Sequence, residues 1–84
     1  MKYTVIWKPA ADQELARLWT EATNRDAVSL AAAEIDRLLG SNPADQGESR
    51  SGAMRVLFVE PVGVFFHVAE LDRIVSVVRV WSII

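Results

Sequence analysis

The sequence contains no cysteine and a single histidine, His67. Without cysteine the chain can form no disulfide and offers no thiolate to a metal, and one histidine excludes a site built from several imidazoles. The glycines, at positions 40, 47, 52 and 63, do not follow the spacing of a phosphate-binding loop. We therefore expect neither a metal nor a cofactor.

An excess of positive charge is also missing. The net charge is -2, whereas a nucleic-acid-binding domain usually carries a clear basic patch. The N-terminal stretch MKYTVIWKP is too short and polar for a signal peptide, and no apolar run approaches the length of a membrane span. These features predict a cytoplasmic protein that does not associate with a membrane.

Length and composition predict one small globular domain spanning residues 1–84. The chain has 84 residues, of which 51% are hydrophobic and 24% charged. Such a composition is typical of a folded domain, although a chain this short builds a core that is only just large enough for independent stability.

The first half predicts a strand followed by a helical hairpin. Tyr3–Trp7 alternates and is rich in β-forming residues, and Pro9 suits the first turn of a helix. Apolar residues then recur at helical spacing up to a break, after which Asn24 or Asp26 can cap a second helix. Gly40 stands where a glycine that ends a helix belongs.

The second half predicts a loop and three strands. Ser41–Gly52 is polar and reads as a loop, and the strands are Met54–Glu60, Val64–Ala69 and Ile74–Trp81. The predicted order is β-α-α-β-β-β. This order favours an α+β fold in which the helical hairpin packs on one face of a mainly antiparallel four-stranded sheet.

Large apolar residues occupy both faces of the predicted strands. Met54, Val56 and Phe58 share one face, while Leu57 and Val59 share the other. Two helices cover only one face of such a sheet, and an exposed apolar face usually marks a binding surface. We therefore predict that a partner chain, or a second copy of this chain, covers the second face. The candidate contact residues are Met54, Val56, Phe58, Phe65 and Trp81.

Candidates for catalysis are few. They are Arg50, Arg55, His67 and Arg79. In a functional interpretation the arginines bind phosphate and His67 transfers a proton. In a structural interpretation, which we favour, Arg55 is an edge residue, Arg79 pairs with Glu60 or Glu70, and His67 is a surface residue.

Three stretches together resemble the RelE/ParE superfamily of bacterial type II toxin–antitoxin toxins. KPAADQELARLW resembles the first helix of that family, IDRLLGSNP the end of its second helix, and GVFFHVAELDRIVSVVRVW its last two strands with an acidic turn between them. The resemblance spans nearly the whole chain and implies the same β-α-α-β-β-β fold. It also implies a toxin, neutralised by an antitoxin, that cuts mRNA on the ribosome or poisons DNA gyrase.

The basic positions of the family's ribonucleases are substituted in this chain. The alignment puts Gly63 at the catalytic arginine, Val62 at a tyrosine, and Val56 and Phe58 at basic positions of the second strand, with Ile83 near a late arginine. We interpret the chain as a toxin-like component whose activity resembles the gyrase-poisoning branch or is degenerate. An apolar groove on the sheet suits an amphipathic helix or an added strand from the antitoxin.

Two alternatives stay open. One is a ribosome-dependent mRNA endoribonuclease that uses the four candidates above. The other is a non-toxic homodimeric interaction module. The expected partners are accordingly a cognate antitoxin, DNA gyrase or the ribosome with its mRNA, and a second copy of the chain.

Overall fold

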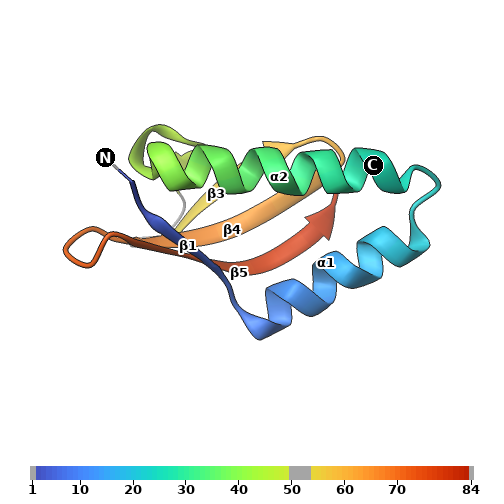
Figure 1. Ribbon diagram of the computed structural model, residues 1–84, viewed down its shortest axis with the longest axis horizontal. Coiled ribbons are helices and arrows are strands. Elements are labelled where there is room, and N and C mark those ends of the chain that lie inside the picture. The colour runs from blue at the N-terminus through green and yellow to red at the C-terminus, as the bar shows by residue number, and fades with distance from the viewer. Residues whose placement is uncertain (1, 50–53, 84) are drawn as a thin grey trace.

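A computed structural model describes residues 2–49 and 54–83, and it shows two helices packed on a five-stranded sheet (Figure 1). The elements are β1 (Thr4–Trp7), α1 (Pro9–Glu21), α2 (Arg25–Ser41), a 3-10 turn (Pro43–Asp45), β2 (Glu48–Ser49), β3 (Met54–Val59), β4 (Val62–Ala69) and β5 (Ile74–Ser82). The predicted α+β class and the order of the long elements are confirmed. Among the described residues, no helix is both long and apolar enough to cross a membrane.

The sheet has the strand order β1-β5-β4-β3-β2, with β1 parallel to β5 and the other pairs antiparallel. The prediction of four strands was wrong by one, because the segment predicted as a loop contains β2. Glu48 and Ser49 pair with Val56 and Arg55. Neither β2 residue favours a strand by itself, so β2 depends on the neighbouring β3, which offers an unpaired edge.

The helices begin where the sequence predicts. Pro9 is the first residue of α1, and the Asn24 side chain caps α2 by accepting a hydrogen bond from the Ala27 N–H at 3.1 Å. The prediction that Gly40 ends the second helix was wrong, since α2 continues one residue further. The Gly40 carbonyl instead accepts a hydrogen bond from the Tyr3 N–H at 2.8 Å, which ties the end of α2 to the start of β1.

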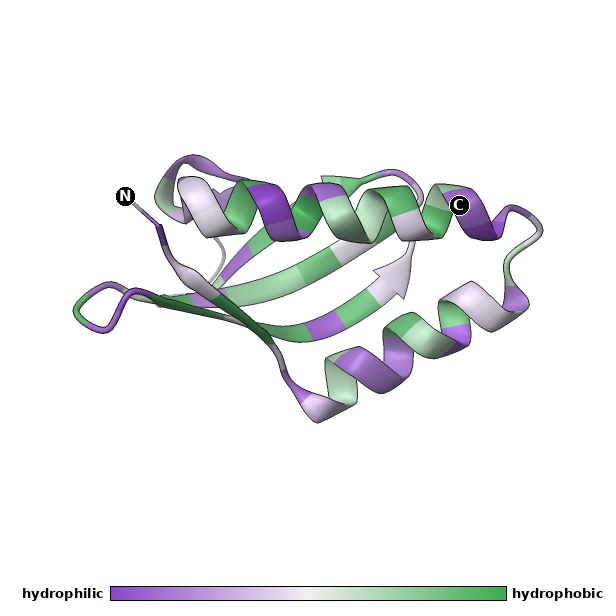
Figure 2. Ribbon diagram, viewed as in Figure 1, coloured by the Kyte–Doolittle hydropathy of each residue, from purple (hydrophilic) through white to green (hydrophobic). Residues whose placement is uncertain are grey.

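The hydrophobic core lies between the helices and one face of the sheet, as the hydrophobic stretches of α2 and the central strands show (Figure 2). Its buried members are Ala11, Val28, Ala31, Ile35, Leu39, Leu57, Val62, Val64, Phe66, Val75, Val77 and Val80. Each large aliphatic or aromatic side chain that is fully buried in such a core stabilises the fold by about 1.5–3 kcal/mol. The core therefore fixes which face of every strand meets the helices.

The register assigns the remaining side chains to the opposite face, called here the outer face. Residues directly opposite each other on antiparallel strands share a face. Leu57 lies opposite the core residue Val64, whereas Phe58 lies opposite Gly63, which in turn lies opposite Trp81. The outer face of β3, β4 and β5 therefore carries Met54, Val56, Phe58, Gly63, Phe65, His67, Ser76, Arg79 and Trp81.

Candidate functional site

An aromatic cluster occupies the outer face around Gly63. The Trp81 ring lies over this glycine, and its ring centroid is 5.0 Å from that of Phe65 and 6.1 Å from that of Phe58, the latter in an edge-to-face arrangement. A Cβ atom at position 63 would lie 2.7 Å from Cε2 of Trp81, so only glycine leaves room for the ring. Such aromatic pairs contribute about 0.5–1.5 kcal/mol each beyond their buried area.

This cluster covers part of the face that the sequence analysis predicts to be open. Val56 is only 2% exposed, although it lies on the outer face between Glu48 and Phe65. Met54, Phe65 and Trp81 are half-buried, and Phe58 is 51% exposed. The exposed apolar surface among the predicted contact residues is therefore narrower than expected and is centred on Phe58.

Arg55 lies on the helix side of the sheet, opposite the core residue Phe66. Its guanidinium donates hydrogen bonds to the backbone carbonyls of Gln46 at 3.0 Å and Gly47 at 3.2 Å. These bonds attach the segment before β2 to β3. The observed role of Arg55 is thus to hold a loop. The predicted edge position was wrong, because β2 pairs with β3 at Arg55.

The prediction that Arg79 pairs with Glu60 or Glu70 was wrong, because Arg79 pairs with Glu14 of α1. Its guanidinium contacts the Glu14 carboxylate, with Nη2 2.9 Å and Nε 3.0 Å from Oε2. The other carboxylate oxygen accepts the Val80 N–H at 2.8 Å. Since β1 pairs with β5 only as far as Val77, the Glu14 carboxylate supplies the acceptor for the Val80 N–H beyond the end of that pairing.

The electrostatics of this edge follow from the same contacts. The hydrogen bond from Arg79, followed by the bond from the Val80 N–H, lowers the pKa of Glu14 below its ordinary value. The Glu14 carboxylate in turn raises the pKa of Arg79. Arg79 is therefore a charge compensated within the protein, which makes it a poor phosphate ligand.

The three candidate catalytic residues that the structure describes do not come together. His67 is exposed on the outer face opposite Met54, Arg55 lies on the helix side, and Arg79 lies at the edge of β5. Arg50 lies outside the described residues. Within residues 2–49 and 54–83 there is also no group of side chains suited to hold a metal ion.

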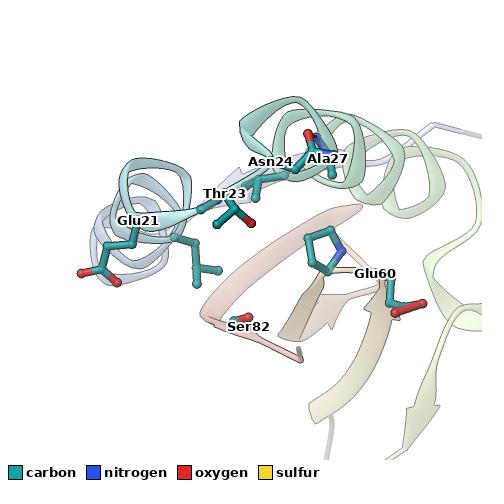
Figure 3. Close-up of a pocket in the computed structure, with 10 residues that line it drawn as sticks. Glu21, Thr23, Asn24, Ala27, Glu60 and Ser82 are labelled. Carbon is teal, nitrogen blue, oxygen red and sulfur yellow. Dashed lines mark hydrogen bonds between the residues drawn. The ribbon is translucent and has the colours of Figure 1, made fainter.

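A pocket of about 570 Å³ lies where the connection from α1 to α2 meets the β3–β4 turn and the end of β5 (Figure 3). It is lined by Leu18, Glu21, Ala22, Thr23, Asn24, Ala27, Val28, Glu60, Pro61 and Ser82. These residues come from the helical hairpin, the β3–β4 turn and the end of β5. Sequence reasoning missed the pocket because no local pattern brings these separate segments together.

Comparison with known proteins defines the fold. No family model matches the chain, and no curated protein matches it. Solved structures do match over almost its whole length. The toxin–antitoxin complex RelBE2 from Mycobacterium tuberculosis has a chain with a TM-score of 0.78 and 14% identity, covering 98% of this chain and 92% of that one.

Two further structures agree. A chain of the chromosomal ParDE TA system from P. aeruginosa gives a TM-score of 0.75 at 15% identity, covering 99% of this chain and 98% of that one. A mutant of the E. coli toxin RelE in the free state gives a TM-score of 0.73 at 14% identity, covering 98% of this chain and 84% of that one. This protein therefore shares the α+β architecture of these chains. More specifically, it has the RelE/ParE fold, as the resemblance predicts.

Proposed function

We propose that this protein is the toxin component of a type II toxin–antitoxin module in the cytoplasm, held inactive by a cognate antitoxin. Its fold is that of chains from the RelBE2 and ParDE systems, matched over 98% and 99% of its length. A match of this extent supports a single toxin domain over residues 1–84. The intrinsic activity is of the gyrase-poisoning kind or is degenerate.

The observation that carries this choice is the contact between Trp81 and Gly63. The resemblance assigns position 63 to the catalytic arginine of the ribonucleases, and here the indole ring lies where that side chain would begin. Phosphodiester cleavage needs cationic stabilisation and proton transfer at one place. Arg55 lies on the helix side of the sheet and Arg79 is paired with Glu14, so these residues and His67 do not provide it.

Induced expression in a bacterial host tests the proposal. We expect growth arrest that is relieved by co-expressing the small reading frame next to this gene. Extracts of arrested cells should show disturbed DNA supercoiling and intact mRNA. Cleaved mRNA on programmed ribosomes would establish the endoribonuclease alternative instead. Harmless overexpression without binding of the neighbouring gene product would establish the non-toxic module, whereas harmless overexpression with such binding would establish a toxin of degenerate activity.

A matched pair of variants tests whether the aromatic cluster contacts the target. Phe58 is 51% exposed and belongs to the cluster, whereas Leu71 is fully exposed in the β4–β5 turn. We expect Phe58→Ala to reduce toxicity at unchanged protein abundance and Leu71→Ala to retain it. Equal toxicity of both variants would remove the outer face from the toxic mechanism.

A further inference from the structure

The floor of the pocket described above is apolar. Val28 is 4% exposed, and Leu18, Ala22, Ala27 and Pro61 are half-buried around it. The volume of about 570 Å³ is within the range of about 300–1,000 Å³ found for ligand pockets. Small residues on the floor leave this space open, so the pocket can accept an apolar side chain from outside.

The rim of the pocket is anionic. Glu21 and Glu60 are exposed at opposite ends, and Figure 3 shows both side chains directed outward. Among the described residues, neither carboxylate has a hydrogen bond or an ion pair. Both carboxylates are therefore available to positive charges that approach from outside.

The cation next to this rim, Arg25, is engaged by α1. Arg25 donates hydrogen bonds to the carbonyls of Trp19 at 3.2 Å and Thr20 at 3.1 Å, and its guanidinium lies 4.9 Å from the centre of the Trp19 ring. These contacts close the last turn of α1. Within the described residues Arg25 therefore forms no ion pair with Glu21 or Glu60, and both carboxylates can still pair with a positive charge of a ligand.

We infer that the pocket binds a segment of the antitoxin that places an apolar side chain on the floor and a Lys or Arg on each side of it. This inference rests on the proposed function, which supplies the partner. Outward-directed carboxylates at both ends suit a ligand that extends beyond the pocket, as a polypeptide does and a small molecule enclosed by the pocket does not. Complementary charge at the rim then fixes the register of the bound segment.

Binding measurements on pocket variants test the inference. The probe is the full-length product of the neighbouring small reading frame, titrated calorimetrically into the purified protein at low and physiological salt. Ala27→Trp fills the floor, and Glu21→Lys/Glu60→Lys reverses the rim. We expect the first variant to weaken binding at least about tenfold, as loss of a buried anchor does, and the second to weaken it about three- to tenfold with a smaller salt dependence.

Matched controls separate the pocket from general effects. Ala33→Trp adds the same side chain on an exposed position of α2, and Asp12→Lys/Asp72→Lys makes the same change in net charge at exposed positions outside the pocket lining. Both controls should bind as the wild type does. If Ala27→Trp fails to fold by circular dichroism, Thr23→Trp in the exposed helix connection replaces it.

Each result decides one claim. Wild-type affinity in both pocket variants overturns this inference while the proposed function stands. A loss with Ala27→Trp but none on charge reversal overturns the cationic character of the segment. If the variants change only self-association, the pocket binds a second copy and the inference is wrong. If the wild type binds nothing and its expression is harmless, the proposed function itself fails.

Discussion

The indole ring of Trp81 lies on the backbone of Gly63, with Cε2, Cζ2 and Nε1 all between 2.7 and 2.9 Å from where a Cβ would stand. The glycine and the tryptophan are cross-strand neighbours on β4 and β5. Because Gly63 has no side chain, the indole ring can pack against the backbone of the central strand β4. Part of the outer face is thereby shielded from water without a third layer of structure.

Gly63→Ala should destabilise the protein by about 1–3 kcal/mol, since the added methyl group overpacks the space beneath the ring. Urea unfolding measures the effect. In a Trp81→Ala background the same substitution should cost much less, because the ring that it displaces is gone. An equal cost in both backgrounds would show that the penalty arises elsewhere.

Two other glycines should respond in opposite directions to alanine. Gly47 has φ +66°, and a Cβ there would lie 1.9 Å from the carbonyl oxygen of Val56. Gly40 lies within α2, and its Cβ would meet only ordinary contacts at 3.8 Å. We expect Gly47→Ala to cost at least about 1–3 kcal/mol and Gly40→Ala to stabilise by about 0.5–1 kcal/mol.

Thermal and urea unfolding of the two variants side by side check this prediction. The pair controls for the loss of chain entropy that every Gly→Ala change brings to the unfolded state. If Gly47→Ala were neutral, the close approach of this backbone to Val56 would have to relax easily. A destabilising Gly40→Ala would place an unexpected constraint on the last turn of α2.

The long elements can be predicted from the sequence because their signals are local. The proline at the start of α1, the Asn24 cap and the β-branched run of β5 each determine their element within a few residues. β2 has no such signal, since its two polar residues adopt a strand only because β3 presents its edge to them. Propensity carries no information about such an induced pairing.

The candidate site was harder to predict, because its contacts join distant parts of the chain. Alternation along the strands correctly placed Phe58 and Phe65 on one face, but the position of the Trp81 ring over Gly63 depends on cross-strand register. The register also shifts between Phe65 and Phe66, where an irregularity in β5 changes its alternation. The partner of Arg79 is Glu14 on α1, which no spacing rule suggests.

The Glu14–Arg79 pair predicts a pH dependence of stability. Its contacts lower the pKa of Glu14 below the ordinary value of 4.5, so the folded state holds the carboxylate charged more strongly than the unfolded state does. The stabilisation is therefore fully present above pH 4.5 and is lost as the pH falls through the lower, folded-state pKa. Glu14→Gln should cost about 1 kcal/mol at neutral pH, and the difference from the wild type should shrink in acid.

Unfolding measured between neutral and acidic pH tests this dependence, with Glu34→Gln as the control. Arg37 also lowers the pKa of Glu34, but that pair lies on the surface of α2, with side-chain exposures of 66% and 39%. Water screens such a pair, so we expect a smaller effect. A pH-independent difference between Glu14→Gln and the wild type would show that the charge on Glu14 does not stabilise the edge of β5.

Alanine variants of Arg55 and His67 test whether these residues have a structural or a catalytic role. Arg55→Ala removes the donor for the carbonyls of Gln46 and Gly47 and should destabilise the protein by about 1–3 kcal/mol, so any loss of toxicity should follow a loss of folded protein. His67→Ala alters an exposed side chain and should leave both stability and toxicity unchanged. Toxicity normalised to folded protein, measured by limited proteolysis of cell lysates, distinguishes the two effects. If either variant abolished toxicity at wild-type abundance, that residue would act in the toxic reaction. This result would support the endoribonuclease alternative, which needs such a catalytic group.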